Sequence, residues 1–130
     1  MPLYHAQRRS PGKSVMHHAI IDTDNRLGLL RSGDVFGRRA VVAEMSTSGP
    51  ITTVVEDLSA WTIVEEVTDL AGARERLPVA QIRGPYDPAL NNCEHFASEV
   101  ATGVRRSLQV QLVAAIACFA LVCFAARRVK

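Results

Sequence analysis

Cys93 carries the clearest indication of chemistry in this chain, because it stands where an extended segment is expected to turn into a helix. Asn92 before it is a favourable N-cap, and the positive end of a helix dipole stabilises a thiolate. Apolar residues then follow Cys93 at the i, i+3, i+4 spacing of an amphipathic helix, at Phe96, Ala97, Val100 and Val104. The pattern predicts a nucleophilic cysteine on the buried face of a helix, at its first turn.

A thiol nucleophile needs a base, and the chain offers four histidines for that role: His5, His17, His18 and His95. Imidazole titrates near neutrality, so it can take the thiol proton and later protonate a leaving group. His95 is two positions after Cys93 on the expected helix, and side chains at that spacing do not face each other. His17 and His18 are neighbours in an expected strand, where side chains alternate between faces, so only one of them can face the helix.

The elements expected to position these residues are short strands followed by helices. Residues 3–7, 15–22, 40–45 and 62–67 predict strands, because they are apolar and rich in branched side chains. Residues 27–39 contain three glycines and predict a loop with one short strand. Residues 68–77 have weak helical character, and Pro78 is expected to end that helix. Strands followed by helices indicate an α+β domain.

An uncharged apolar segment follows, in residues 112–126 (L-V-A-A-I-A-C-F-A-L-V-C-F-A-A). Extended back to Leu108, it approaches the ~30 Å of a bilayer core at ~1.5 Å per residue. Basic residues flank both ends as interfacial anchors: Arg105 and Arg106 before it, and Arg127, Arg128 and Lys130 after it. A domain this small has little core to surround such a helix. We therefore expect a thiol-bearing domain in residues 1–106 and a single C-terminal membrane anchor in residues 107–130.

Composition narrows the function classes and the compartment. Residues 1–12 are polar and broken by prolines, unlike a secretory signal, so the thiol-bearing domain is expected in the cytosol. Cys118 and Cys123 lie in the apolar segment, which leaves Cys93 alone in the domain and excludes a disulfide framework. The net charge is +2, and without the last basic cluster the domain is near neutral, which argues against nucleic-acid binding. The sequence carries no metal-ligand spacing or nucleotide motif, so no metal and no cofactor is expected.

Two motifs of this chain resemble the lecithin:retinol acyltransferase family. Residues 17–21 (H-H-A-I-I) resemble its H-W-A-I-Y box, and residues 92–96 (N-C-E-H-F) match its cysteine signature. Residues 61–72 (W-T-I-V-E-E-V-T-D-L-A-G) and 103–110 (G-V-R-R-S-L-Q-V) are similar to segments of its H-Ras-like suppressor branch. That branch consists of small phospholipase A and N-acyltransferase proteins that end in one membrane anchor. The resemblance covers most of the chain.

The resemblance implies a permuted papain-like (NlpC-type) fold, in which a small antiparallel sheet packs on the cysteine-bearing helix. It implies Cys93 as nucleophile and His17 as general base, with His18 where the family usually has tryptophan. The implied substrate is a phospholipid, whose ester Cys93 attacks to form an acyl thioester before water or an amine takes the acyl chain. A membrane anchor would keep the site beside this insoluble substrate.

The chain departs from the family at the residue that orients the base. The family has a second histidine in a V-V-H-L stretch, whereas residues 41–45 here are V-V-A-E-M, and strand register decides whether Ala43 or Glu44 takes its place. Glu44 would hold an imidazole N–H and stabilise the cation, and Ala43 would not. Two hypotheses follow. One is a membrane-anchored phospholipase A or N-acyltransferase, and the other is a protein of the picornaviral type that keeps both motifs and acts by binding at membranes.

Overall fold

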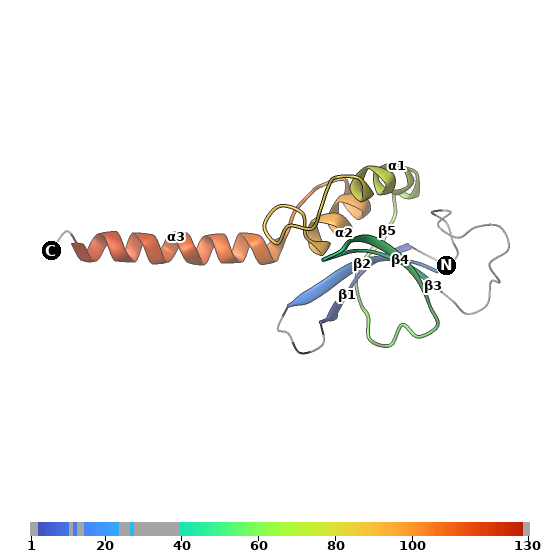
Figure 1. Cartoon of the computed structure of the whole chain (residues 1–130), viewed down its shortest axis with the longest axis horizontal. Helices are drawn as coiled ribbons and strands as arrows, with labels where there is room; N and C mark the ends of the chain where they lie inside the picture. Colours follow the sequence, from blue (N-terminus) through green and yellow to red (C-terminus); the bar gives the residue numbers. More distant parts are fainter. Residues whose placement is uncertain (1–2, 11, 13–14, 24–26, 28–39, 129–130) are drawn as a thin grey trace.

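The computed structural model describes residues 3–10, 12, 15–23, 27 and 40–128 of the chain. The expected loop and strand of residues 28–39 and the basic residue Lys130 lie outside the described residues. The described part is α+β, as predicted, and Figure 1 shows its strands gathered in one sheet with two helices over it. The strands are β1 (Leu3–Arg9), β2 (Met16–Asp22), β3 (Ala40–Ser46), β4 (Gly49–Val55) and β5 (Thr62–Val67). The helices are α1 (Leu70–Gln81), α2 (Cys93–Thr102) and α3 (Leu108–Arg128).

The sheet has the order β4-β3-β2-β1-β5, and every neighbouring pair in it is antiparallel. β3 pairs with β2 only from Ala19, opposite Glu44, to Asp22, opposite Val41. The start of β2, residues 16–18, therefore has no partner on the β3 side. β4 is a strand that the sequence reasoning missed. Its side chains are mostly exposed, so it lacks the alternation of a strand with one buried face.

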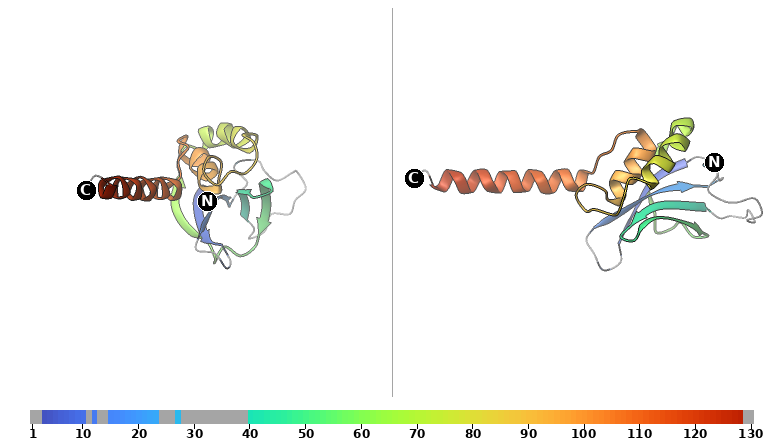
Figure 2. Two further views of the ribbon diagram at one scale, coloured as in Figure 1. Left: turned by 60° about the vertical axis from the view of Figure 1, so that its left-hand side comes forward. Right: turned by 45° about the horizontal axis from the view of Figure 1, so that its top comes forward.

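Helices α1 and α2 cover one face of the sheet, as the two views of Figure 2 show. Ile20 of β2 and Ala43 of β3 belong to this face, where they pack in one core with Phe96 and Val100 of α2. Phe96 is 1 % exposed and is the largest fully buried side chain among the described residues. The opposite face has a second, smaller core, built on Ala6, Ala19, Ile21, Ala40 and Val42. Successive residues of β2 therefore enter different cores.

Helix α1 runs through Pro78, so the prediction that this proline ends the helix is wrong. The turn continues, and the Ile82 N–H donates to the Pro78 carbonyl at 3.3 Å. Leu77 and Ala80, on either side of the proline, are buried in the core shared with α2. We attribute the continuation to this burial, which offsets the hydrogen bond that a proline cannot donate.

Helix α2 begins at Cys93, as predicted, but ends earlier than the apolar spacing indicated. Gly103 has a φ of +76° and forms a left-handed cap, with its N–H donating to the Glu99 carbonyl at 2.9 Å. Only glycine enters this conformation without steric cost, so the residue type ends the helix. Val104 consequently lies beyond α2, where its side chain is exposed.

Helix α3 extends away from the sheet (Figure 1) and contains the apolar segment predicted to be helical. Its span Leu108–Arg127 has 20 residues, enough in length and apolarity to cross a membrane. The apolar window of this span has no residue buried against the rest of the chain. The described part of the chain thus leaves the apolar surface of this helix uncovered, as we expect for a segment that spans a membrane.

Candidate functional site

Asn92 fixes Cys93 as the first residue of α2. Its backbone is extended, and its side-chain oxygen accepts a hydrogen bond from the His95 N–H at 3.0 Å. In return, the His95 Nδ1 accepts from the Asn92 N–H at 3.5 Å, which completes a capping box. Cys93 is 6 % exposed, so the predicted buried position at the positive end of the helix is confirmed.

The Cys93 thiol lies against the open start of β2. Its sulfur is 3.9 Å from the Met16 carbonyl oxygen, which also accepts a hydrogen bond from the Gln109 side chain of α3 at 3.2 Å. The next residue, His17, interacts with the thiol through its side chain. Because β3 pairs with β2 only from Ala19 onward, a side chain from α2 has access to this edge. The structure thus brings Cys93 and His17 together.

Glu44 is the residue that holds the other side of the His17 ring. The His17 Nε2 lies 2.7 Å from the Glu44 Oε2, and the Glu44 side chain is 8 % exposed. The strand register explains this contact, since Glu44 pairs with Ala19 and shares its face of the sheet, whereas Ala43 pairs with Ile20 in the core under α2. Of the two alternatives that the sequence left open, Glu44 is the one that reaches the histidine.

The environment of His17 favours its charged form. The contact with Cys93, followed by the hydrogen bond with Glu44, raises the pKa of His17 to about 9 against the opposing effect of burial. Since the carboxylate occupies Nε2, the nitrogen left to face the sulfur is Nδ1. At neutral pH His17 is therefore an imidazolium, and it lies between the Cys93 sulfur and the Glu44 carboxylate. The carboxylate oxygen also lies 3.8 Å from the guanidinium of Arg8, which stacks on Trp61.

The other histidines have different partners. The alternation in β2 holds, and it is His18 that lies on the same face as Ile20, under α2. The His18 Nδ1 is 3.0 Å from the His5 Nε2, and the His5 Nδ1 is 3.1 Å from Glu65. Burial lowers the pKa of His18 to about 4, so this ring is neutral at physiological pH. Burial, reinforced by the neighbouring Arg105, also lowers the pKa of His95.

An apolar groove of about 530 Å³ opens at the Cys93 thiol. One wall comes from Val15 and Met16 at the start of β2 and from the loop before α2, where Tyr86 and Ala89 lie. The other wall comes from α3, whose contributing residues beyond Gln109 are Val110, Val113, Ala114 and Ala117. None of the residues that line the groove is charged. Its volume falls within the roughly 300–1,000 Å³ of small-molecule sites, so it can hold an apolar part of a substrate.

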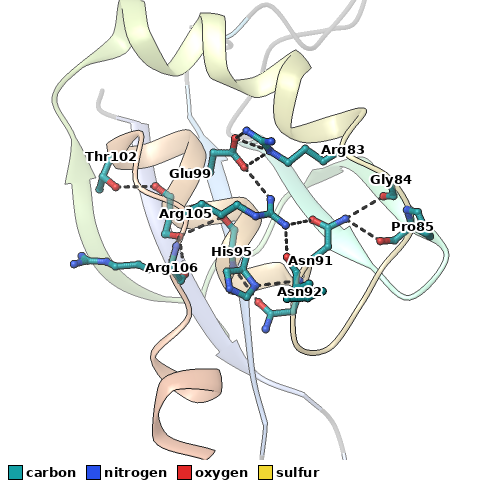
Figure 3. A network of polar contacts seen from close by, with 12 residues as sticks. Arg83, Gly84, Pro85, Asn91, Asn92, His95, Glu99, Thr102, Arg105 and Arg106 are labelled. Carbon is teal, nitrogen blue, oxygen red and sulfur yellow. Dashed lines mark hydrogen bonds and ion pairs between the residues drawn. The ribbon is translucent and has the colours of Figure 1, made fainter. Parts of the chain in front are cut away.

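A polar network, drawn in Figure 3, holds the loop that delivers the chain to Cys93. The Asn91 side chain donates to the Gly84 carbonyl at 3.1 Å and accepts from the Arg105 Nη2 at 2.9 Å. Arg105 also donates to Glu99 of α2 at 3.0 Å, and Glu99 accepts from Arg83 on its other side at 2.8 Å. Burial opposes ionisation of Glu99, but the two arginines outweigh it and hold its pKa below the ordinary value. Arg105, expected from sequence as an interfacial anchor, is therefore part of the scaffold around the thiol.

The first turn of α3 is joined to the first turn of α2. The Glu94 carboxylate accepts hydrogen bonds from the Ser107 hydroxyl at 2.6 Å and from the Gln109 N–H at 3.2 Å. Asn92 donates to the same hydroxyl at 3.3 Å, which in turn accepts from the Val110 N–H at 3.3 Å as an N-cap. Burial opposes ionisation of Glu94, but these hydrogen bonds lower its pKa. Sequence reasoning missed this junction, although a serine before an apolar run is a signal for a helix start.

Comparison with known proteins found no family model, no curated protein and no solved structure that matches this chain. The family resemblance of the two motifs therefore stays a prediction.

Proposed function

We propose that this chain is a membrane-anchored phospholipase A or N-acyltransferase that works through an acyl thioester on Cys93. The observation that carries the proposal is the placement of His17 between Cys93 and Glu44, with Cys93 itself lining an uncharged groove. A thiol, an imidazole and a carboxylate in this order form a nucleophile, a base and an orienting group. The proposed fold is the permuted papain-like one, with the helix of the nucleophile packed on an antiparallel sheet.

The first half-reaction transfers the acyl group of a lipid ester to the enzyme. With its proton held by His17, the Cys93 thiolate forms a bond with the ester carbonyl carbon, and the carbon–oxygen bond to the glycerol breaks. His17 gives its proton to the departing oxygen, so that lysolipid leaves and a neutral thioester remains. The Glu44 carboxylate keeps the ring oriented and stabilises the imidazolium before the proton is given.

The second half-reaction returns the enzyme to its starting state. Neutral His17 takes a proton from water or from an amine, whose oxygen or nitrogen then bonds to the thioester carbon. The carbon–sulfur bond breaks, and Cys93 leaves as the thiolate beside the protonated ring. Water gives a free fatty acid, and an amine gives an N-acyl product. Since His5 and His18 are engaged with each other, His17 is the histidine placed to carry out both proton transfers.

The apolar surfaces of the chain favour a lipid over a soluble ester. The groove beside the thiol is uncharged, and one of its walls is the helix that is long enough to span a membrane. A phospholipid in the same membrane would reach the thiol without passing through water. We accordingly place the sheet domain on the cytosolic side, with α3 as its single anchor.

The test uses the full chain in vesicles of phosphatidylcholine and phosphatidylethanolamine. Mass spectrometry should find lysolipid together with fatty acid or N-acyl-phosphatidylethanolamine, and Cys93→Ala should form neither. In the same vesicles, iodoacetamide should modify Cys93 much faster than Cys118 or Cys123, and His17→Ala should remove the difference. Lipid that stays intact, with equal labelling before and after that substitution, would exclude the enzyme and favour the second hypothesis, a protein that binds partners at membranes.

A further inference from the structure

Helix α3 contributes a defined stripe of side chains to the groove. Val110, Val113, Ala114 and Ala117 line it, and their i, i+3, i+4, i+7 spacing places them on one side of the helix. Seven residues of helix correspond to a rise of about 10 Å. The groove therefore follows α3 for about two turns, from Val110 to Ala117.

The stripe has a fixed position relative to the thiol. Residues on both sides of Cys93 bind the start of α3, with Glu94 and Asn92 each hydrogen-bonded to the Ser107 hydroxyl at 2.6 and 3.3 Å. From α3 itself, Gln109 donates to the Met16 carbonyl that also lies next to the sulfur. Three hydrogen bonds from different elements thus tie α3 to the neighbourhood of the nucleophile, so the helix is more than a tether.

We infer that α3 forms the acyl-chain wall of the active site, and that Val113 sets the length of chain that reaches Cys93. The inference rests on the proposed function, since it takes the acyl chain of the attacked lipid as the occupant of the groove. Two observations select this occupant. The Cys93 thiol lines the groove, and the walls of the groove offer apolar contact without any charged group. A chain that lies along the stripe has its ester carbonyl at the sulfur.

Val113 is suited to limit the chain because its neighbours on the stripe, Ala114 and Ala117, are small. A bulky side chain at 113 would fill the space that the alanines leave open. Leu112 offers a matched control, since it is adjacent in sequence and similarly exposed, at 63 % against 67 % for Val113, but it does not line the groove. A tryptophan at either position adds similar volume to α3, but only the one at 113 enters the groove.

The experiment measures how Cys93 discriminates between reagents of different chain length. The full chain, with Cys118→Ala and Cys123→Ala, is treated in micelles with N-ethylmaleimide and with N-dodecylmaleimide, and intact mass gives both rates. We expect Val113→Trp to lower the ratio of the dodecyl rate to the ethyl rate about tenfold, and Leu112→Trp to leave it unchanged. Val110→Trp, on the same stripe, provides a second variant if Val113→Trp has reduced helix content by circular dichroism.

The results distinguish the proposed role of α3 in the groove from the proposed reaction at Cys93. An equal ratio in the parent, Val113→Trp and Val110→Trp would overturn the inference, even if the parent releases lysolipid. A lower ratio in the stripe variants supports the wall, and it does so even if the parent forms no lipid product, in which case only the proposed reaction fails. A ratio that falls as much in Leu112→Trp also contradicts the inference, because the effect would then not depend on the groove.

Discussion

Replacement of Glu44 by glutamine tests the site most directly, because it removes a charge and keeps the shape of the side chain. The pKa of His17 is about 9, against an ordinary value of 6.5, and the contacts that raise it are those with Cys93 first and Glu44 second. A shift of this size corresponds to about 3 kcal/mol in favour of the charged ring. Since Glu44 supplies the smaller contribution, we expect Glu44→Gln to lower the pKa of His17 by about one unit, or ~1.4 kcal/mol.

An NMR titration of the chain with isotope-labelled histidine measures this pKa. Cys93→Ser should lower the pKa of His17 by more than Glu44→Gln does, because the cysteine is the larger cause. Glu65→Gln is the matched control, since that carboxylate lies 3.1 Å from His5 and has no hydrogen bond with His17 among the described contacts. We expect it to leave the pKa of His17 unchanged.

The same substitution has a defined effect on stability. Because folding raises the pKa of His17, its contribution to the free energy of unfolding is fully present below pH 6.5 and is lost as the pH rises through about 9. In Glu44→Gln this loss should begin at the same pH, because the unfolded pKa is unchanged, but it should be complete about one pH unit lower, as measured by denaturant titrations of the full chain in micelles. A pKa of His17 that stays at its parent value in Glu44→Gln would refute the role of the carboxylate. A fall as large in Glu65→Gln would show that the effect is not local.

Three further substitutions test the elements that position the thiol. Phe96→Ala should lower the free energy of unfolding by about 3–5 kcal/mol in denaturant titrations, because the ring is 1 % exposed in the core between α2 and the sheet. A change below about 1 kcal/mol, the size expected of a surface substitution, would contradict that packing. Gly103→Ala should cost about 1–2 kcal/mol in the same assay, because its φ of +76° is unfavourable for alanine, and an unchanged stability would argue against the left-handed cap. Glu94→Gln should speed hydrogen exchange at the Gln109 amide, because a charged acceptor is replaced by a neutral one, and exchange at the parent rate would show that this junction does not hold α3.

The sequence was sufficient for those parts of the structure that follow from local chemistry. Asn92 caps α2 because its side chain competes well for the free N–H groups of a helix start, and this property needs no knowledge of the fold. β2 and β5 were found because branched side chains in an extended segment fit a pleated sheet. α3 was found because a long uncharged run has few alternatives to a helix.

Long-range packing determined the features that the sequence did not predict. Pro78 disfavours a helix locally, but Leu77 and Ala80 find their core only when α1 lies on α2, and this contact cannot be read from their order in the chain. The position of Glu44 depends on the register between β2 and β3. These strands are separated by 17 residues, most of which lie outside the described part of the chain, so the register cannot be read from local sequence. Glu94 and Ser107 are likewise far apart in sequence, and their hydrogen bond forms only because the chain doubles back after α2.

The carboxylate at position 44 changes the chemistry that a second histidine would give. A neutral imidazole could orient His17 through a hydrogen bond, but it would add no net charge to stabilise the protonated ring. Glu44 adds a full negative charge 2.7 Å from Nε2, and this contact contributes to the raised pKa of His17. In the proposed reaction, the proton for the leaving lysolipid would therefore be retained to a higher pH than a pair of histidines would allow. Glu44, in place of the histidine of the motif that this chain resembles, would extend the pH range of the proposed reaction and keep the proposed roles of Cys93 and His17.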